Sequence, residues 1–176
     1  MLAMPSPAHA CGIWFLKDHG AKREGVFEIN AVRVSPYASD PSDRRSHAVR
    51  EPVTIALVNN PEGPATCSFG GQNISIRPDG AFAGRKKLAT IDGDRWTVAG
   101  KAYDVSITAK PHAEFPWRWH VSIEQNGALV AEGDAMSFAC TGPSPGKEYD
   151  RQNVAQHLMC YMLARAQGFK RFSPGK

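Results

Sequence analysis

The feature that most constrains the fold is the alternation in residues 117–124, WRWHVSIE. Apolar side chains occupy the odd positions and polar side chains the even positions. A period of two indicates a β-strand with one buried face and one face toward solvent. Asn126-Gly127 follows after Gln125, and this pair accepts positive φ angles at low cost. We therefore predict a hairpin turn that leads into a second strand at 128–133.

Apolar runs of strand length recur through most of the chain, separated by Gly, Pro, Asn and Asp. In 26–34 the alternation slips by one position after Ala31, which indicates a β-bulge. The remaining runs predict strands at 11–17, 53–58, 65–69, 73–77, 81–91, 95–99, 102–108 and 135–141.

The C-terminal segment has a different period. Val154, Leu158, Tyr161 and Met162 recur at helical spacing, and Gly168 is placed to end the helix, so we predict one helix over about 147–167. Strands followed by a single helix predict a mainly β (α+β) chain. We expect an antiparallel, partly closed sheet or sandwich of about eight to ten strands, with the C-terminal helix packed on it.

The length of 176 residues suits one domain, which we place at 11–176. Residues 1–10 are predicted to be a leader or a disordered segment. Ala8-His9-Ala10 resembles a signal-peptide cleavage site, but residues 1–10 lack the apolar stretch of a signal. The prediction is a cytoplasmic protein; the alternative is an exported or periplasmic one.

Four cysteines stand far apart, at Cys11, Cys67, Cys140 and Cys160. In the cytosol they would be reduced and mostly buried. In an exported, disulfide-stabilised domain they would form two disulfides, for which three pairings exist. The sequence leaves these possibilities open.

Two features allow an enzyme as an alternative. Cys11-Gly12-Ile13 resembles the start of the glutaminase domain of class II glutamine amidotransferases, which implies a Cys11 nucleophile freed by cleavage after Ala10. The likeness does not extend to the family's Asn-Gly element, because Asn126-Gly127 lies in a predicted hairpin. His157 and Cys160 would share one helix face, but a single mixed pair does not make a zinc motif. We predict no metal, no cofactor and no catalytic residue, so a non-enzymatic role is favoured.

Basic side chains gather in a few places, and the net charge is +4. Residues 35–52 form a long polar loop of the kind that carries binding residues. We predict a binding, accessory or inhibitor protein, of the kind found in phages or mobile elements, with a protein or nucleoprotein partner; the alternative is a nucleic-acid-binding protein. The predicted binding residues are Tyr37, Arg44, Arg45, His47, Arg50, Arg85, Lys86, Lys87, Arg118, His120, Lys170 and Arg171.

Overall fold

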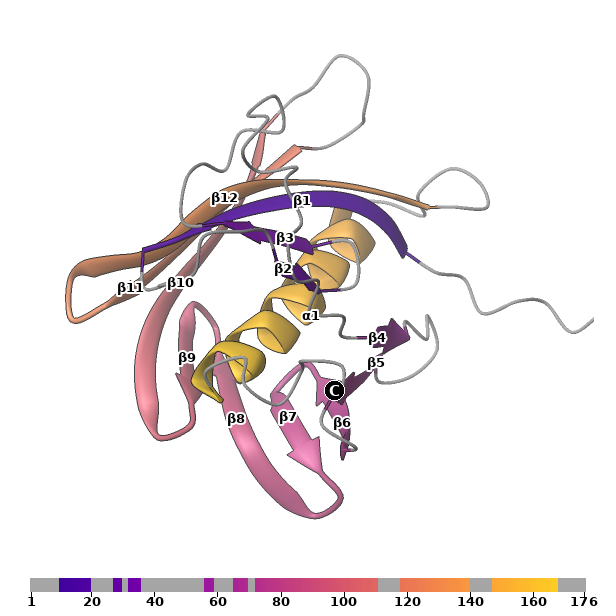
Figure 1. Ribbon diagram of the computed structural model, residues 1–176, viewed down its shortest axis with the longest axis vertical. Helices are drawn as coiled ribbons and strands as arrows, with labels where there is room; N and C mark the ends of the chain where they lie inside the picture. The colour runs from indigo at the N-terminus through magenta and orange to yellow at the C-terminus, as the bar shows by residue number, and fades with distance from the viewer. Residues whose placement is uncertain are drawn as a thin grey trace, which may run out of the picture.

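The computed structural model describes residues 10–19, 27–29, 32–35, 56–58, 65–69, 72–110, 118–139 and 147–167. Within these ranges the protein is mainly β, and a long curved sheet surrounds the C-terminal helix α1 (Lys147–Ala166) (Figure 1). This arrangement confirms the predicted fold class.

The strands have the following bounds: β1 (Ala10–Asp18), β2 (Phe27–Ile29), β3 (Val32–Ser35), β4 (Ala56–Val58), β5 (Ala65–Phe69), β6 (Gln72–Arg77), β7 (Gly80–Ala83), β8 (Lys86–Asp92), β9 (Arg95–Val98), β10 (Lys101–Lys110), β11 (Arg118–Gln125) and β12 (Ala128–Ala139).

Most of the sheet is an up-and-down meander. Strands β4 to β12 follow one another across the sheet in chain order, each antiparallel to its neighbour. Beyond β12 lies β1, which is antiparallel to it, then β3, which is parallel to β1, and then β2. The order therefore begins at β2 and ends at β4, and these two strands do not pair, so the sheet is curved but open.

Three strand predictions were wrong in detail. The phase slip in 26–34 is a chain reversal, because β2 pairs antiparallel with β3. The predicted strand 81–91 is two strands, because the chain turns at Gly84, whose φ of +61° favours glycine. The runs 128–133 and 135–141 belong to one strand, β12, because Asp134 lies within the ladder opposite His120 and does not interrupt it.

The Asn-Gly prediction is confirmed. Asn126 and Gly127 have φ values of +51° and +75°, the positive values that a tight hairpin turn between β11 and β12 requires. The alternation of β11 is confirmed as well: Trp119, Val121 and Ile123 are buried. The strand therefore turns its apolar face toward the helix and its polar face away from it.

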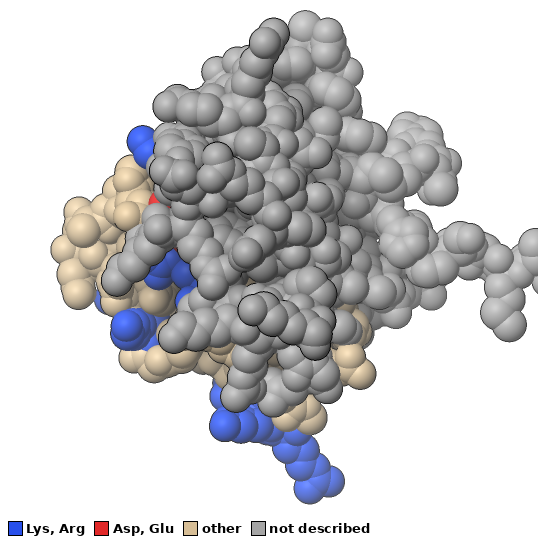
Figure 2. Space-filling model, viewed as in Figure 1, with Lys and Arg blue, Asp and Glu red and all other residues tan. Residues whose placement is uncertain are grey.

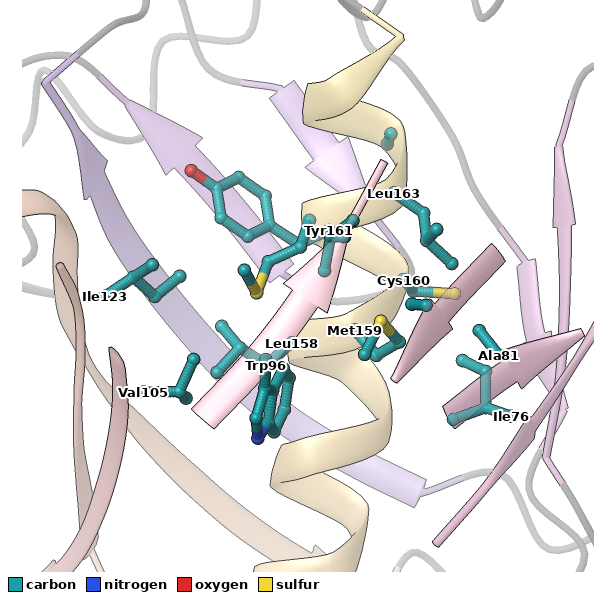
Figure 3. Packing of buried hydrophobic residues seen from close by; sticks show 14 of the residues in the cluster. Ile76, Ala81, Trp96, Val105, Ile123, Leu158, Met159, Cys160, Tyr161 and Leu163 are labelled. Carbon is teal, nitrogen blue, oxygen red and sulfur yellow. The ribbon is translucent and has the colours of Figure 1, made fainter. Parts of the chain in front are cut away.

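The core lies between the concave face of the sheet and α1, which packs on β5, β9, β10 and β12. All residues from His157 to Ala164 are buried, which is more than two full helical turns. A helix buried all around its circumference needs cover on several sides. Figure 3 shows this cover, with Val105 and Ile123 on one side of the helix and Ile76 and Ala81 on the other.

Candidate functional site

The structure describes the side chains of only some residues that the sequence predicts to bind a partner. These are Arg85, Lys86, Lys87 and His120. For Arg118 the structure describes the backbone in β11 alone. The other predicted binding residues lie outside the described residues: Tyr37, Arg44, Arg45, His47, Arg50, Lys170 and Arg171.

Three of the predicted cations lie together at the turn between β7 and β8. Arg85, Lys86 and Lys87 are exposed there. Phe82 of β7 contacts two basic side chains. The guanidinium carbon of Arg77, on the neighbouring strand β6, lies 4.6 Å from the centroid of the Phe82 ring, and Lys87 Nζ of β8 lies 5.5 Å from that centroid. Figure 2 shows Lys and Arg side chains gathered at the lower edge of the molecule, where Figure 1 places this turn. We call these five residues the basic hairpin surface.

The structure does not bring His120 to this surface. His120 lies on β11, and three strands, β10, β9 and β8, separate β11 from β7 in the sheet. Its Nδ1 lies 2.9 Å from Asp134 Oδ1 on the facing position of β12. This pair belongs to the polar face of β11 and β12.

His157 and Cys160 are both buried on α1, but Cys160 is joined elsewhere. It forms a disulfide with Cys67 of β5, with a Cα–Cα distance of 6.0 Å. His157 Nδ1 lies 2.7 Å from the carbonyl oxygen of Asn153. Burial lowers the pKa of His157, against the opposing effect of this hydrogen bond. With the disulfide intact, Cys160 has no free thiol for catalysis or metal ligation.

The remaining cysteine predictions fall outside what the structure describes. Cys140 lies outside the described residues, and only the backbone of Cys11 is described, in β1. Within the described part of the chain, no group of three or more His, Cys, Asp and Glu residues is placed to hold a metal ion.

A buried polar cluster joins the C-terminal half of α1 to β1. The Asp18 carboxylate accepts hydrogen bonds from the Tyr161 hydroxyl and, at 3.0 Å, from Arg165 Nε. Burial and the Asp18 charge raise the pKa of Tyr161 well above its ordinary value. Burial lowers the pKa of Arg165, but the combined effects of Asp18, Tyr161 and Tyr103 outweigh burial and raise that pKa. This cluster fixes the helix in place and leaves no space for a ligand around the carboxylate, since Asp18 is 1% exposed.

The N-terminal half of α1 is packed differently: Asn153 and Val154 are buried, but a pocket of about 260 Å³ lies between another part of this half and the sheet. Its floor is apolar and is formed by Ile76, Ile91, Trp96, Val105, Ile107 and Ala155. Its rim is polar and includes Arg77, Asp94, Glu148, Arg151, Gln152 and Gln156. The indole N–H of Trp96 donates to the Gly93 carbonyl at 3.1 Å, which orients the ring in the pocket wall.

Sequence reasoning did not find this pocket. Its lining residues come from β6, β8, β9, β10, the turn before β9 and α1, so no local spacing groups them. The only sequence signal was the Asp92-Gly93-Asp94 turn, which is read most simply as a turn.

No protein-family model matches this chain, and no curated protein or solved structure matches it. The helix that the structure describes is not apolar enough over its length to cross a membrane.

Proposed function

We propose that this protein is a non-enzymatic binding protein that docks on an acidic protein surface through the basic hairpin surface. The observation that carries the proposal is the exposed run of Arg85, Lys86 and Lys87 on a hairpin held within the sheet. Between residues 72 and 91 there are four basic side chains and a single carboxylate, Asp79. This local excess of positive charge steers an acidic partner toward the hairpin.

The ring contacts at Phe82 support docking on a protein. Arg77 and Lys87 lie against the half-buried Phe82, which restrains both long side chains before a partner arrives. Side chains that are already ordered lose less entropy on binding. An accessory or inhibitory role would follow from occupation of the partner's surface.

Nucleic acid is the less favoured partner because base stacking needs an open aromatic face. The ring of Phe82 is in contact with two cations, and Trp119 is 1% exposed and faces the core. The alternation of aromatic and basic residues in β11 therefore does not form a stacking platform on the outer face of the sheet.

The test compares two double charge reversals. Arg85→Glu/Lys86→Glu alters the basic hairpin surface, and Lys101→Glu/Lys110→Glu alters exposed lysines of β10 by the same net charge. Each variant and the native protein are titrated with fluorescent poly-glutamate and with a fluorescent single-stranded oligonucleotide over a range of salt concentrations. We expect poly-glutamate to bind about tenfold more weakly to the hairpin variant at low salt, and unchanged to the β10 variant.

Equal losses in the two variants would overturn the role of the hairpin. Tighter binding of the oligonucleotide than of poly-glutamate, with the loss confined to the hairpin variant, would replace the protein partner with a nucleic acid.

The Cys67–Cys160 disulfide supports a second proposal, that the protein works in an oxidising compartment as an exported domain. Disulfides persist outside the reducing cytosol. The intact mass of the protein purified from its host under non-reducing conditions tests this. We expect a mass lower by the lost thiol hydrogens; a fully reduced chain would contradict export.

A further inference from the structure

The pocket beside the N-terminal half of α1 lies apart from the Arg85–Lys87 turn and from the buried Asp18 cluster. The geometry points to a small zwitterionic molecule with an apolar body, of the chemical class of an apolar amino acid, bound between α1 and strands β6, β8, β9 and β10. This inference does not rest on docking at the basic hairpin surface, although the two sites share Arg77.

The size of the pocket sets the size of the ligand. Pockets for drug-sized molecules measure about 300–1,000 Å³. At about 260 Å³, this pocket takes a smaller molecule, on the scale of a single amino acid. The apolar floor includes the ring of Trp96, which is 3% exposed and held by its bond to Gly93, so one wall is preformed. An apolar or aromatic side chain would replace water over this floor.

The charges of the rim set the head group. Two guanidinium groups, from Arg77 and Arg151, stand beside two carboxylates, from Asp94 and Glu148. A purely anionic head group would meet both carboxylates, and a purely cationic one would meet both arginines. A zwitterion places its carboxylate on a guanidinium and its ammonium on a carboxylate, so it complements both signs. The amides of Gln152 and Gln156 add donors and acceptors.

The charged side chains of the rim can contact a ligand, because the ion pair between two of them is weak. Arg151 Nη2 lies 3.9 Å from Asp94 Oδ1, a long ion pair between side chains that are 40% and 80% exposed. A pair of this kind contributes little to stability. The guanidinium therefore keeps most of its donors for a bidentate contact with a ligand carboxylate.

The experiment uses three ligands that share one apolar body. L-phenylalanine carries both charges, 3-phenylpropionate lacks the ammonium, and phenethylamine lacks the carboxylate. We expect L-phenylalanine to bind the native protein with a dissociation constant between about 10 µM and 1 mM by titration calorimetry. Each single-charge analogue should bind about tenfold more weakly.

Two rim variants assign the charges. Arg151→Gln should weaken L-phenylalanine and 3-phenylpropionate by about tenfold and leave phenethylamine unchanged. Asp94→Asn should weaken L-phenylalanine and phenethylamine and leave 3-phenylpropionate unchanged. Both side chains are exposed enough that the fold is retained, which circular dichroism checks. Arg77 is left in place because it also belongs to the basic hairpin surface.

A filling variant locates the ligand. Ala155→Phe places a ring in the pocket and should abolish binding of L-phenylalanine, while Ala166→Phe, at the exposed far end of α1, should not.

Equal affinity for L-phenylalanine and 3-phenylpropionate would overturn the proposal that the ligand is a zwitterion. Undiminished binding to Ala155→Phe, or no binding of L-phenylalanine at millimolar concentration, would overturn the site. None of these variants changes Arg85 or Lys86, so the poly-glutamate titration remains an independent result.

Discussion

The two halves of α1 pack on the same sheet to different extents. In the C-terminal half every residue from His157 to Ala164 is buried, and Cys160 and Tyr161 tie the helix to β5 and to β1. Figure 3 shows these two side chains leaving the helix on opposite sides. In the N-terminal half a pocket lies between helix and sheet, and the ion pair across it, Arg151 with Asp94, is long and exposed.

This difference means that the C-terminal half of α1 mainly contributes to stability, and the N-terminal half mainly contributes to ligand binding. A close-packed region tolerates neither loss nor gain of volume, and a buried carboxylate tolerates no loss of its partners. A region with a pocket contributes fewer packing contacts, but it leaves space for a ligand and polar groups that can bind it. We therefore expect substitutions in the C-terminal half to change stability and those in the N-terminal half to change binding.

The largest effect is expected from the disulfide. Cys67 and Cys160 are 93 residues apart in the sequence, so the bond closes a long loop and lowers the entropy of the unfolded chain. The double variant Cys67→Ala/Cys160→Ala should lose about 4 kcal/mol of unfolding free energy in urea titrations. Reductant should lower the stability of the native protein by a similar amount. If it lowers that of the double variant equally, the stabilising bond is not this one.

The next effect is at the buried carboxylate. Asp18→Asn removes the charge of the buried carboxylate that accepts hydrogen bonds from Tyr161 and from the partly exposed Arg165, and should cost about 3 kcal/mol of unfolding free energy. The matched control is Asp104→Asn, which removes the same charge from the exposed pair with Arg95, where the side chains are 56% and 60% exposed. That control should cost less than about 1 kcal/mol. Equal losses of unfolding free energy in urea titrations would show that the buried Asp18 charge contributes no more to stability than the exposed Asp104 charge.

A matched pair of helix substitutions tests the packing difference itself. Ala164→Phe adds a ring where the alanine is fully buried, and overpacking should cost about 2 kcal/mol. Ala155→Phe adds the same ring at the pocket, where space exists, and should cost less than about 0.5 kcal/mol. The difference in thermal midpoint between the two variants measures the contrast. Similar midpoints would mean that the two halves are equally packed.

The smallest effect concerns His157. Burial lowers its pKa in the folded protein below the ordinary 6.5 of the unfolded chain. Below about pH 6.5 the unfolded state binds a proton that the folded state does not, so stability rises with pH and is lost as the pH falls through this range. Unfolding free energies measured from pH 7 to pH 5 should fall less steeply in His157→Gln. An unchanged slope would place the acid sensitivity in other groups.

Local patterns in the sequence were enough to predict much of the sheet and the helix. The alternation of 117–124, the Asn126-Gly127 turn and the helical spacing of 147–167 correspond to β11, its hairpin and α1. Each of these depends on neighbours in sequence, either through side-chain period or through φ preference. The chain reversal after Ile29 was missed because the phase slip beside it also fits a β-bulge, and the reversal at Gly84 was missed because the residues on both sides of the turn were read as one strand.

By itself the sequence determined the class of fold, the position of the C-terminal helix and the run of cations from Arg85 to Lys87. Only the tertiary structure decided that the curved sheet surrounds the helix, that Cys160 pairs with Cys67, and that Asp18 meets Tyr161 across the core. It also decided that α1 and four strands, β6, β8, β9 and β10, enclose a pocket. These contacts join residues far apart in the chain, and period and turn propensity carry no information about which distant surfaces meet.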